Sequence, residues 1–368
     1  MKTISKGLII TGLGILIFAG YLIFPYPNQI TDVAVAGKPV YTGTLYVAGM
    51  GGHFAKVRVE IDPANTEGPI KINGLDRVVL GTKKTHPTHD ARIDANNRNI
   101  MFWSTYKLDN GKVHVGKTDL TTGEIITERS DILDPRAKWT GALYCASGQT
   151  KSSFIPLTMT DEAYIDIFDK DTFGLKQRIF LDELGYKDNY KFFHGTNTPD
   201  MKKFLVVINR TTEGRPNGNI DLLMLDLEAL EGGKVKLLSK NTITGEPGKT
   251  LTFRQYFTED GKYILQSGAD RFFLINAQTL KLIDEEMMKI GTQSHDAKGT
   301  PDSNYAILTL RKAVNNSEGK KITDGMVQLY DIKAKKVVGK PVSVCNACHE
   351  KMGFSKSAIL CGLDANWD

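Results

Sequence analysis

The residues of this chain best suited to chemistry lie near its end, where Cys345, Cys348 and His349 form the run Cys-Asn-Ala-Cys-His. Two cysteines separated by two residues and followed by histidine have the spacing of a c-type haem attachment site. In such a site the thiols form thioethers with the haem vinyl groups, and the imidazole binds the iron. We therefore predict one covalently bound haem c at this position.

Four cysteines are present, and a disulfide or a metal site is the alternative use for them. Cys145, Cys345, Cys348 and Cys361 allow three disulfide pairings, and an exported protein favours disulfides. A metal site made by Cys345, Cys348 and His349 is the other alternative. A histidine placed directly after the Cys-x-x-Cys pair is more than a disulfide framework requires, which favours haem.

Four of the seven histidines recur at one place ahead of an apolar strand. His89 and His295 begin the near-identical tetrapeptides His-Asp-Ala-Arg and His-Asp-Ala-Lys, and His194 and His349 stand at a similar distance before the next strand. Imidazoles that converge on one axis can bind iron or copper. His89, His194 and His295 are the expected sources of a distal haem ligand; the alternative is an open iron position that binds a small molecule. Packing or turn capping by each histidine separately is the alternative.

Other charged and ring side chains are expected near the same face. His53 lies in a loop that opens on it and His86 just before an inner strand, whereas His114 alternates within an outer strand and is expected at the surface. Arg210 and Arg311, at strand ends, would pair with haem propionates or attract an anion, with solvated loop charge as the alternative. Asp90 and Asp296 directly follow paired histidines, and would either orient those imidazoles or stabilise a turn.

A repeat of about fifty residues must position these side chains. In each copy an alternating apolar strand ends in Asp or Asn, and a polar turn and another strand follow. Such a period, built from short strands and Gly, Asn and Asp turns, indicates an all-β propeller. Helical periodicity is nearly absent, with short exceptions near 181–185 and 227–230. The closing residues of the repeated strand are Asp62, Asp119, Asp169, Asp226, Asn276 and Asp331.

The strand that precedes each repeat sets the expected number of blades. Seven apolar cores of this kind occur, the last at 358–360, which predicts seven blades with six as the alternative. A propeller ring closes when strands from the two ends of the chain pair with each other. The alternating stretch Thr31–Ala36 is the expected closing strand.

The turns before three of these strands resemble those of YVTN-type propellers. They are Pro199-Asp200, Glu259-Asp260-Gly261 and Pro301-Asp302, and the resemblance covers about residues 40 to 363. The histidines at 89, 194 and 295 resemble those of the seven-bladed propellers of nitrous oxide reductase and of haem-carrying nitrite reductase. That resemblance implies copper or a second haem on a His-lined face. A Cys-x-x-Cys-His motif in the last blade departs from both families.

The first thirty residues have the composition of a membrane segment. Lys2 and Lys6 precede an uncharged apolar run from Gly7 to Phe24, long enough to span a bilayer. Pro25-Tyr26-Pro27 follows instead of a small-residue cleavage site, which favours an uncleaved anchor. The lysines stay inside, so we expect residues 31–368 in the periplasm, held at the inner membrane.

Composition limits the remaining functions. The formal net charge of +5 is mild and evenly spread, which argues against nucleic acid as a partner. No phosphate-binding loop, nucleophile elbow or His-Glu-x-x-His run is present. The sequence thus predicts a membrane-anchored propeller cytochrome that exchanges electrons with redox partner proteins. The alternatives are an oxidoreductase that uses copper or haem to reduce a small nitrogen or sulfur species, and a propeller scaffold without cofactor.

Overall fold

The computed structural model describes residues 38–368 except 50, 107, 109–111, 133, 137–143, 160–161, 316 and 352–359. Lys38–Asp368 forms one compact unit. The expected anchor, 1–30, and the expected closing strand, Thr31–Ala36, lie outside the described residues. Among the helices that are described, none has the length and apolar character to cross a bilayer.

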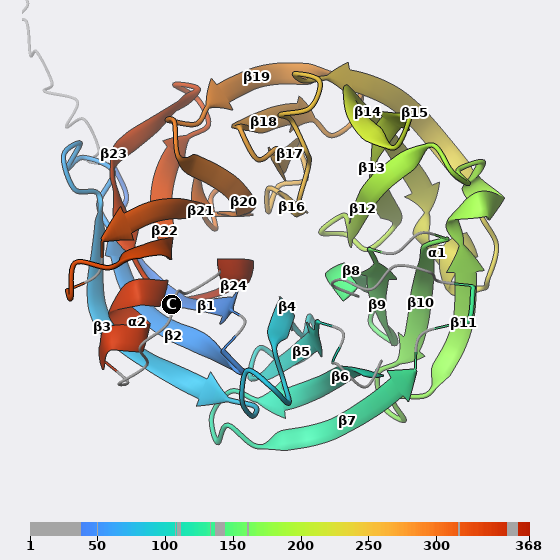
Figure 1. The fold of residues 1–368 in the computed structure, drawn as a ribbon, viewed down its shortest axis with the longest axis horizontal. Coiled ribbons are helices and arrows are strands. Elements are labelled where there is room, and N and C mark those ends of the chain that lie inside the picture. Colours follow the sequence, from blue (N-terminus) through green and yellow to red (C-terminus); the bar gives the residue numbers. More distant parts are fainter. Residues whose placement is uncertain are drawn as a thin grey trace, which may run out of the picture. The chain divides into compact units, whose positions relative to one another are not determined.

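The chain folds into six four-stranded antiparallel sheets, the blades of a propeller (Figure 1). The innermost strands contact one another in cyclic order, which closes the ring. In order from the innermost strand, blade 1 holds β24(Leu360–Trp367), β1(Tyr41–Gly49), β2(His53–Ile61) and β3(Ile70–Val79); blade 2 holds β4(Thr88–Ile93), β5(Ile100–Thr105), β6(Lys112–Asp119) and β7(Ile125–Ile132); blade 3 holds β8(Tyr144–Gln149), β9(Ser153–Thr158), β10(Tyr164–Asp169) and β11(Leu175–Phe180). Blade 4 holds β12(Tyr190–Asn197), β13(Lys203–Thr212), β14(Arg215–Asp226) and β15(Leu237–Thr244); blade 5 holds β16(Gln255–Phe257), β17(Tyr263–Ser267), β18(Arg271–Asn276) and β19(Leu282–Met287); blade 6 holds β20(Thr292–Gly299), β21(Tyr305–Asn315), β22(Lys321–Asp331) and β23(Lys336–Ser343).

Three short helices interrupt the strands in the described part of the chain: η1(Leu181–Leu184), α1(Leu227–Glu231) and α2(Cys345–Lys351). The first two lie where the sequence indicated helical exceptions. Helix α2 was not predicted. It follows blade 6 and precedes β24, and Figure 1 shows it beside β2 and β3.

Burial explains why the middle strands read as continuous apolar runs. The faces of β9, β10 and the first part of β13 are covered by neighbouring blades, so all or nearly all side chains of β9 and β10 are buried, as are those from Phe204 to Asn209 in β13. The outermost strands β11, β15 and β19 are largely exposed. Between blades 2 and 3 the rings of Phe102, Phe154 and Phe173 stack with centroids 4.9 and 6.3 Å apart. Such apolar contacts between blades are the main source of stability.

The described residues form six blades rather than seven, because the strand that begins at Leu360, the last residue of the seventh apolar core, belongs to blade 1. This strand, β24, pairs antiparallel with β1 from Gly43 opposite Trp367 to Gly49 opposite Leu360. The last strand therefore completes the first sheet and leaves no exposed inner edge. The ring of Trp367 meets that of Tyr41 edge-on at 6.4 Å, which packs the end of the chain against the closure.

The turns that resemble YVTN propellers share one hydrogen-bonding pattern. The Thr258 hydroxyl donates to Asp260 Oδ1 at 2.7 Å and accepts the backbone N–H of Tyr263 at 3.1 Å. Thr198 with Asp200 and Thr300 with Asp302 repeat it at 2.6 and 2.8 Å. The turn then needs a residue in the left-handed region, which Gly261 supplies at φ +69°.

Candidate functional site

The inner strands place three of the predicted histidines near the start of their blades. His89 lies in β4, His194 in β12 and His295 in β20, and all three side chains are buried. The strand pairing shifts register between Thr88 and Asp90, and again between Ser294 and Asp296. His89 and His295 therefore occupy the same β-bulge in two blades, a feature that re-aims a side chain. We call His89, His194 and His295 the inner-strand histidines.

Aromatic rings and burial keep these imidazoles in an apolar setting. Phe253 lies near two of them, stacked on His295 at 4.6 Å and 6.3 Å from His194. The Nδ1–H of His89 donates a hydrogen bond to the Tyr144 carbonyl oxygen at 2.7 Å. Burial, with the nearby Arg254 charge, lowers the pKa of His194 to about 3. The same two causes lower the pKa of His89 well below its usual value.

The Arg254 side chain lies beside the inner-strand histidines. Arg254 donates to the Asp90 carboxylate and to the His89 carbonyl, and both charged side chains are buried. The Ser147 hydroxyl donates to the other Asp90 oxygen. Asp90 therefore binds the Arg254 guanidinium instead of orienting an imidazole.

Asp296 also differs from its predicted role. Its carboxylate accepts the backbone N–H of Leu363 at 2.9 Å, which fixes the closing strand β24 to blade 6. Tyr256 donates to the Leu363 carbonyl at 2.7 Å from blade 5. Burial raises the pKa of Asp296 to about 7, although Arg254 acts in the opposite direction.

A cavity of about 630 Å³ opens at the other ends of the inner strands. Arg92 and Lys298, the fourth residues of the two matching tetrapeptides, both line it. Lys298 Nζ lies 3.0 Å from Glu259 and 3.4 Å from Asp364, so the wall is polar and of mixed charge. No sequence motif predicted this cavity. The shared Arg/Lys position was the signal that could have indicated it.

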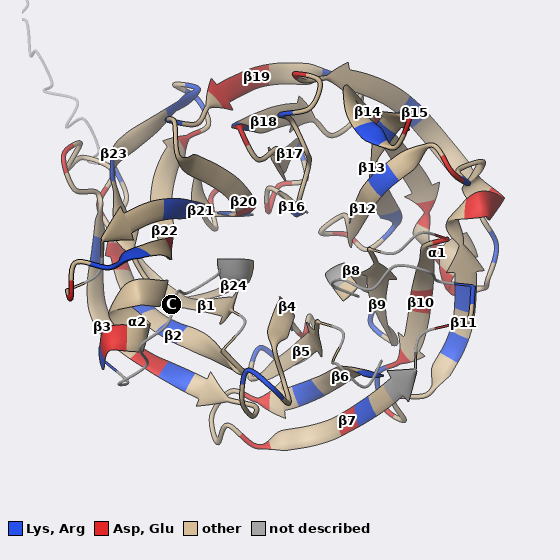
Figure 2. Cartoon of the chain, viewed as in Figure 1, with Lys and Arg blue, Asp and Glu red and all other residues tan. Residues whose placement is uncertain are grey.

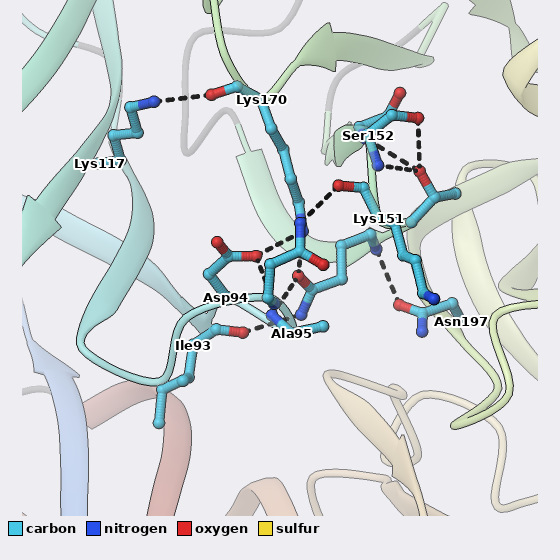
Figure 3. A network of polar contacts seen from close by, with 12 residues as sticks. Ile93, Asp94, Ala95, Lys117, Lys151, Ser152, Lys170 and Asn197 are labelled. Atoms are coloured by element: carbon cyan, nitrogen blue, oxygen red, sulfur yellow. Dashed lines mark hydrogen bonds and ion pairs between the residues drawn. The ribbon is translucent and has the colours of Figure 1, made fainter.

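A polar network between blades 2, 3 and 4 borders the cavity (Figure 3). Lys170 Nζ donates to Asp94 at 2.6 Å and to the Gln149 amide oxygen at 2.7 Å. Gln149 in turn donates to the Ile93 carbonyl, and its backbone N–H donates to Asn197 at 2.8 Å. Only 5% of the Lys170 side chain is exposed, so this network connects the turns of three blades.

The predicted haem residues lie in helix α2 rather than on an inner strand. Cys345, Cys348 and His349 stand at positions i, i+3 and i+4, which places them on one helix face. His349 is therefore not in register with the inner-strand histidines. The backbone N–H of Asn346 donates to Asp324 Oδ1 at 2.7 Å, which anchors the first turn of the helix to blade 6.

His53, at the start of β2, lies beside this helix. Its ring centroid is 5.7 Å from that of His349, and its Nε2 is 3.8 Å from the Cys348 Sγ. Burial, together with the His349 charge, lowers the pKa of His53 to about 4. We call Cys345, Cys348, His349 and His53 the α2 site.

Both helix thiols face an apolar cluster formed by blades 1 and 6. Cys345 is 5% and Cys348 0% exposed, among side chains that include Val57 and Val327. Cys348 is present as a thiol, and burial raises its pKa. Cys145 and Cys361 lie in β8 and β24, and their side chains are outside the described part of the structure.

The two arginines predicted at a cofactor are separated. Arg210 Nη1 pairs with Asp221 at 3.2 Å, in blade 4. Arg311 lies with its guanidinium 6.0 Å from the Phe253 ring, and its charge contributes to the lowered pKa of His89. Arg311 thus accompanies the inner-strand histidines, whereas Arg210 belongs to an ion pair within its own blade.

The described residues bring three or more His, Cys, Asp or Glu ligand atoms within 4.8 Å of one another at a single place: His86, His114 and Glu128. His86 is predicted on the same face as the inner-strand histidines and His114 at the surface, and no sequence pattern singled out Glu128. The alternating pattern does show that His114 points to one face of its strand. Only the folded loop brings His86 to that face.

Comparisons with known proteins concern the fold. No protein-family model and no curated protein matches the sequence. The chain is similar to the Dos1 propeller, with 15% identity and a TM-score of 0.44, over 78% of this chain and 66% of that chain. It is similar to Kuenenia stuttgartiensis hydrazine synthase, with 14% identity and a TM-score of 0.43, over 70% of this chain and 64% of that chain. It is also similar to the Neurospora crassa Pan2 WD40 domain, with 13% identity and a TM-score of 0.45, over 70% of this chain and 66% of that chain. The chain spans slightly less than two thirds of each. The propeller assignment itself rests on the strand order.

Proposed function

We propose that the chain is a propeller cytochrome that carries one covalent haem c at the α2 site and transfers electrons. The observation that supports the proposal most is the placement of Cys345, Cys348 and His349 on one face of a helix with His53 beside them. Two thiols, an imidazole and apolar surroundings are the donor set and environment that a haem c requires. When bound, the haem would supply one-electron transfer.

The residues of the α2 site then have separate roles. Cys345 and Cys348 hold the cofactor, and His349 is the proximal ligand. His53 replaces the inner-strand histidines as the proposed second ligand, since it is the imidazole that lies beside His349. Because both thiols are buried, attachment has to take place before α2 packs against blades 1 and 6.

Covalent attachment can be tested directly. The full chain is produced together with a cytochrome c maturation system, and haem is detected on a denaturing gel. We expect a haem-stained band that a Cys345→Ser/Cys348→Ser variant loses and a Cys145→Ser/Cys361→Ser variant keeps. A wild-type protein without haem, or a haem-positive Cys345→Ser/Cys348→Ser variant, would overturn the proposal.

The role of His53 has its own readout. His53→Ala should retain the covalent haem, because the thiols are unchanged, but the absorption spectrum should change from six-coordinate low-spin to five-coordinate iron. His194→Ala serves as the control, since His194 lies in β12. A spectral change in His194→Ala alone would show that an inner-strand histidine, and not His53, is the distal ligand.

Export and membrane attachment belong to the same proposal. The apolar run from Gly7 to Phe24 would anchor the propeller at the inner membrane with its blades in the periplasm, where haem is attached. Redox partner proteins would then exchange electrons at the ring. Figure 2 shows acidic and basic residues interleaved around the outer strands in this view. Fractionation of cells that produce the chain with and without residues 1–30 tests the anchor.

The inner-strand histidines support a second candidate, an oxidoreductase that uses copper or a second haem to reduce a small nitrogen or sulfur species. The specific observation is that His89 and His194 are buried with lowered pKa values, so they remain neutral and able to bind metal at neutral pH. Metal analysis of the haem-loaded protein separates the two: copper retained by wild type and lost in His89→Ala/His295→Ala would favour this candidate.

A further inference from the structure

His86, His114 and Glu128 form a compact cluster on blade 2, apart from the α2 site and the inner-strand histidines. Their ligand atoms lie within 4.8 Å of one another. We propose that these three side chains bind one divalent transition-metal ion, of which Zn²⁺ is the best match. The inference does not depend on the proposed haem.

The distances between His86 and Glu128 are those of neighbouring ligands at a metal ion. His86 Nε2 lies 3.3 Å from each carboxylate oxygen of Glu128, and His114 Nδ1 contacts Oε1 of the same group. Zinc binds imidazole nitrogen and carboxylate oxygen at about 2.0–2.2 Å, so neighbouring tetrahedral ligands lie about 3.3–3.5 Å apart. An ion can therefore bind between His86 and Glu128 once the His114 ring moves back from the carboxylate oxygen that it contacts.

Two strands and one glycine hold the first pair of ligands. His114 in β6 pairs with Ser130 and Glu128 in β7 pairs with Gly116, so the histidine and the glutamate are diagonal neighbours on one sheet face. Gly116 has no side chain between them, and a Cβ there would lie 2.3 Å from the Trp103 ring. The sheet thus presents both ligands over the Trp103 indole.

The loop between blades 1 and 2 supplies the third ligand in a fixed orientation. The backbone N–H of His86 donates to the Thr82 carbonyl at 2.7 Å, and its ring meets Trp103 edge-on at 5.8 Å. The Thr85 hydroxyl lies 3.0 Å from His86 Nδ1, which leaves Nε2 facing Glu128. A second partner on the far ring nitrogen is the usual support of a metal-bound histidine.

Two imidazoles and one carboxylate with solvent access leave a coordination position open. The side chains are 15%, 15% and 26% exposed at His86, His114 and Glu128. This donor set and open position fit Zn²⁺, and also Co²⁺, Ni²⁺ or Cu²⁺, better than Ca²⁺ or Mg²⁺, which prefer oxygen ligands. A bound ion would also fasten the inter-blade loop to the outer strands of blade 2. The alternative is a hydrogen-bonded cluster without metal.

The test is titration of metal-free full-length protein with Zn²⁺ by calorimetry and with Co²⁺ by visible absorption. We expect binding at this site that His114→Ala and the near-isosteric Glu128→Gln weaken by at least about tenfold, and that Thr85→Ala weakens by about tenfold. Glu124→Gln, on the same hairpin and exposed, is the matched control and should bind as wild type. Circular dichroism of each variant verifies that the propeller is folded.

The Co²⁺ spectrum identifies the site that is occupied. Nitrogen and oxygen ligands give only weak visible bands, whereas binding at Cys345 or Cys348 adds strong thiolate charge-transfer absorption. The proposal is overturned if wild type binds neither ion, if the folded Glu128→Gln and His114→Ala variants both bind as tightly as wild type, or if the charge-transfer bands account for all bound cobalt.

Discussion

The Arg254 guanidinium and the Asp90 carboxylate form an ion pair that joins blade 5 to blade 2, opposite blades of the ring. Their side chains are 4% and 0% exposed. A buried pair of this kind is costly to break from one side, because the remaining charge is left without a counterion in a poorly solvated place. The pair thus holds opposite sides of the ring together where the sequence predicted imidazoles that converge on one axis.

Removal of one partner of this pair should destabilise the protein strongly. We expect Arg254→Met to lower the free energy of unfolding by about 3–5 kcal/mol. Adding Asp90→Asn to it should recover part of that loss, because the orphaned charge is gone. Chemical denaturation measures both. Lys249→Met is the control: its pair with Glu246 is 66% and 44% exposed, so its effect should be small. Equal effects in Arg254→Met and the control would contradict the prediction.

His194 and Asp296 should change the free energy of unfolding with pH in opposite directions. His194 has a pKa of about 3 when folded and near 6.5 when unfolded, so stability is lost as pH falls through that window. Asp296 has a folded pKa of about 7 and an unfolded value near 3.8, so its contribution is lost as pH rises. Each slope is at most about 1.4 kcal/mol per pH unit.

Substitutions at these positions should separate the two contributions. Between pH 4 and 6.5, His194→Gln should lower the slope of the free energy of unfolding against pH, because the contribution that rises with pH is removed. Asp296→Asn should increase this slope, because the contribution that falls with pH is removed. Urea unfolding at several pH values measures the slopes, and a shared direction for the two variants would show that the assignments are wrong.

The helix thiols should be inert in folded, haem-free protein. Cys345 and Cys348 are buried, and thiolate is the reactive form, which the raised pKa of Cys348 makes scarcer. In a Cys145→Ser/Cys361→Ser background, alkylation followed by mass spectrometry should be far slower in buffer than in denaturant. Rapid modification of both thiols without unfolding would mean that α2 is not packed as described.

The network around Lys170 should contribute to stability as a unit. Lys170→Met leaves Asp94 and the Gln149 amide oxygen without their ammonium partner in a nearly buried place, and we expect a loss of about 2–4 kcal/mol. Lys151→Met, an exposed lysine in the same region of Figure 3, is the control. Thermal unfolding of the two variants gives the comparison, and a loss as small as that of the control would refute the assigned role.

The sequence by itself determined the propeller. Alternating strands that end in Asp or Asn about every fifty residues predict the third strand of each of the six blades, counted from the innermost strand. The alternation and the turn chemistry are local properties of the sequence. The carboxylates of Asp119 and Asp169 do accept turn N–H groups, as local patterns imply. The two short helices were equally visible, since their residues are neighbours in the chain.

Only the tertiary structure decided the closure and the grouping of the side chains. A strand such as β24 reads the same whether it begins a seventh blade or completes the first, because its partner β1 lies at the other end of the chain. The matching tetrapeptides at His89 and His295 showed a repeated position, but not that Arg254 arrives beside it from an opposite blade. His53 beside His349, and His86 beside His114, are likewise contacts between segments that local pattern cannot relate.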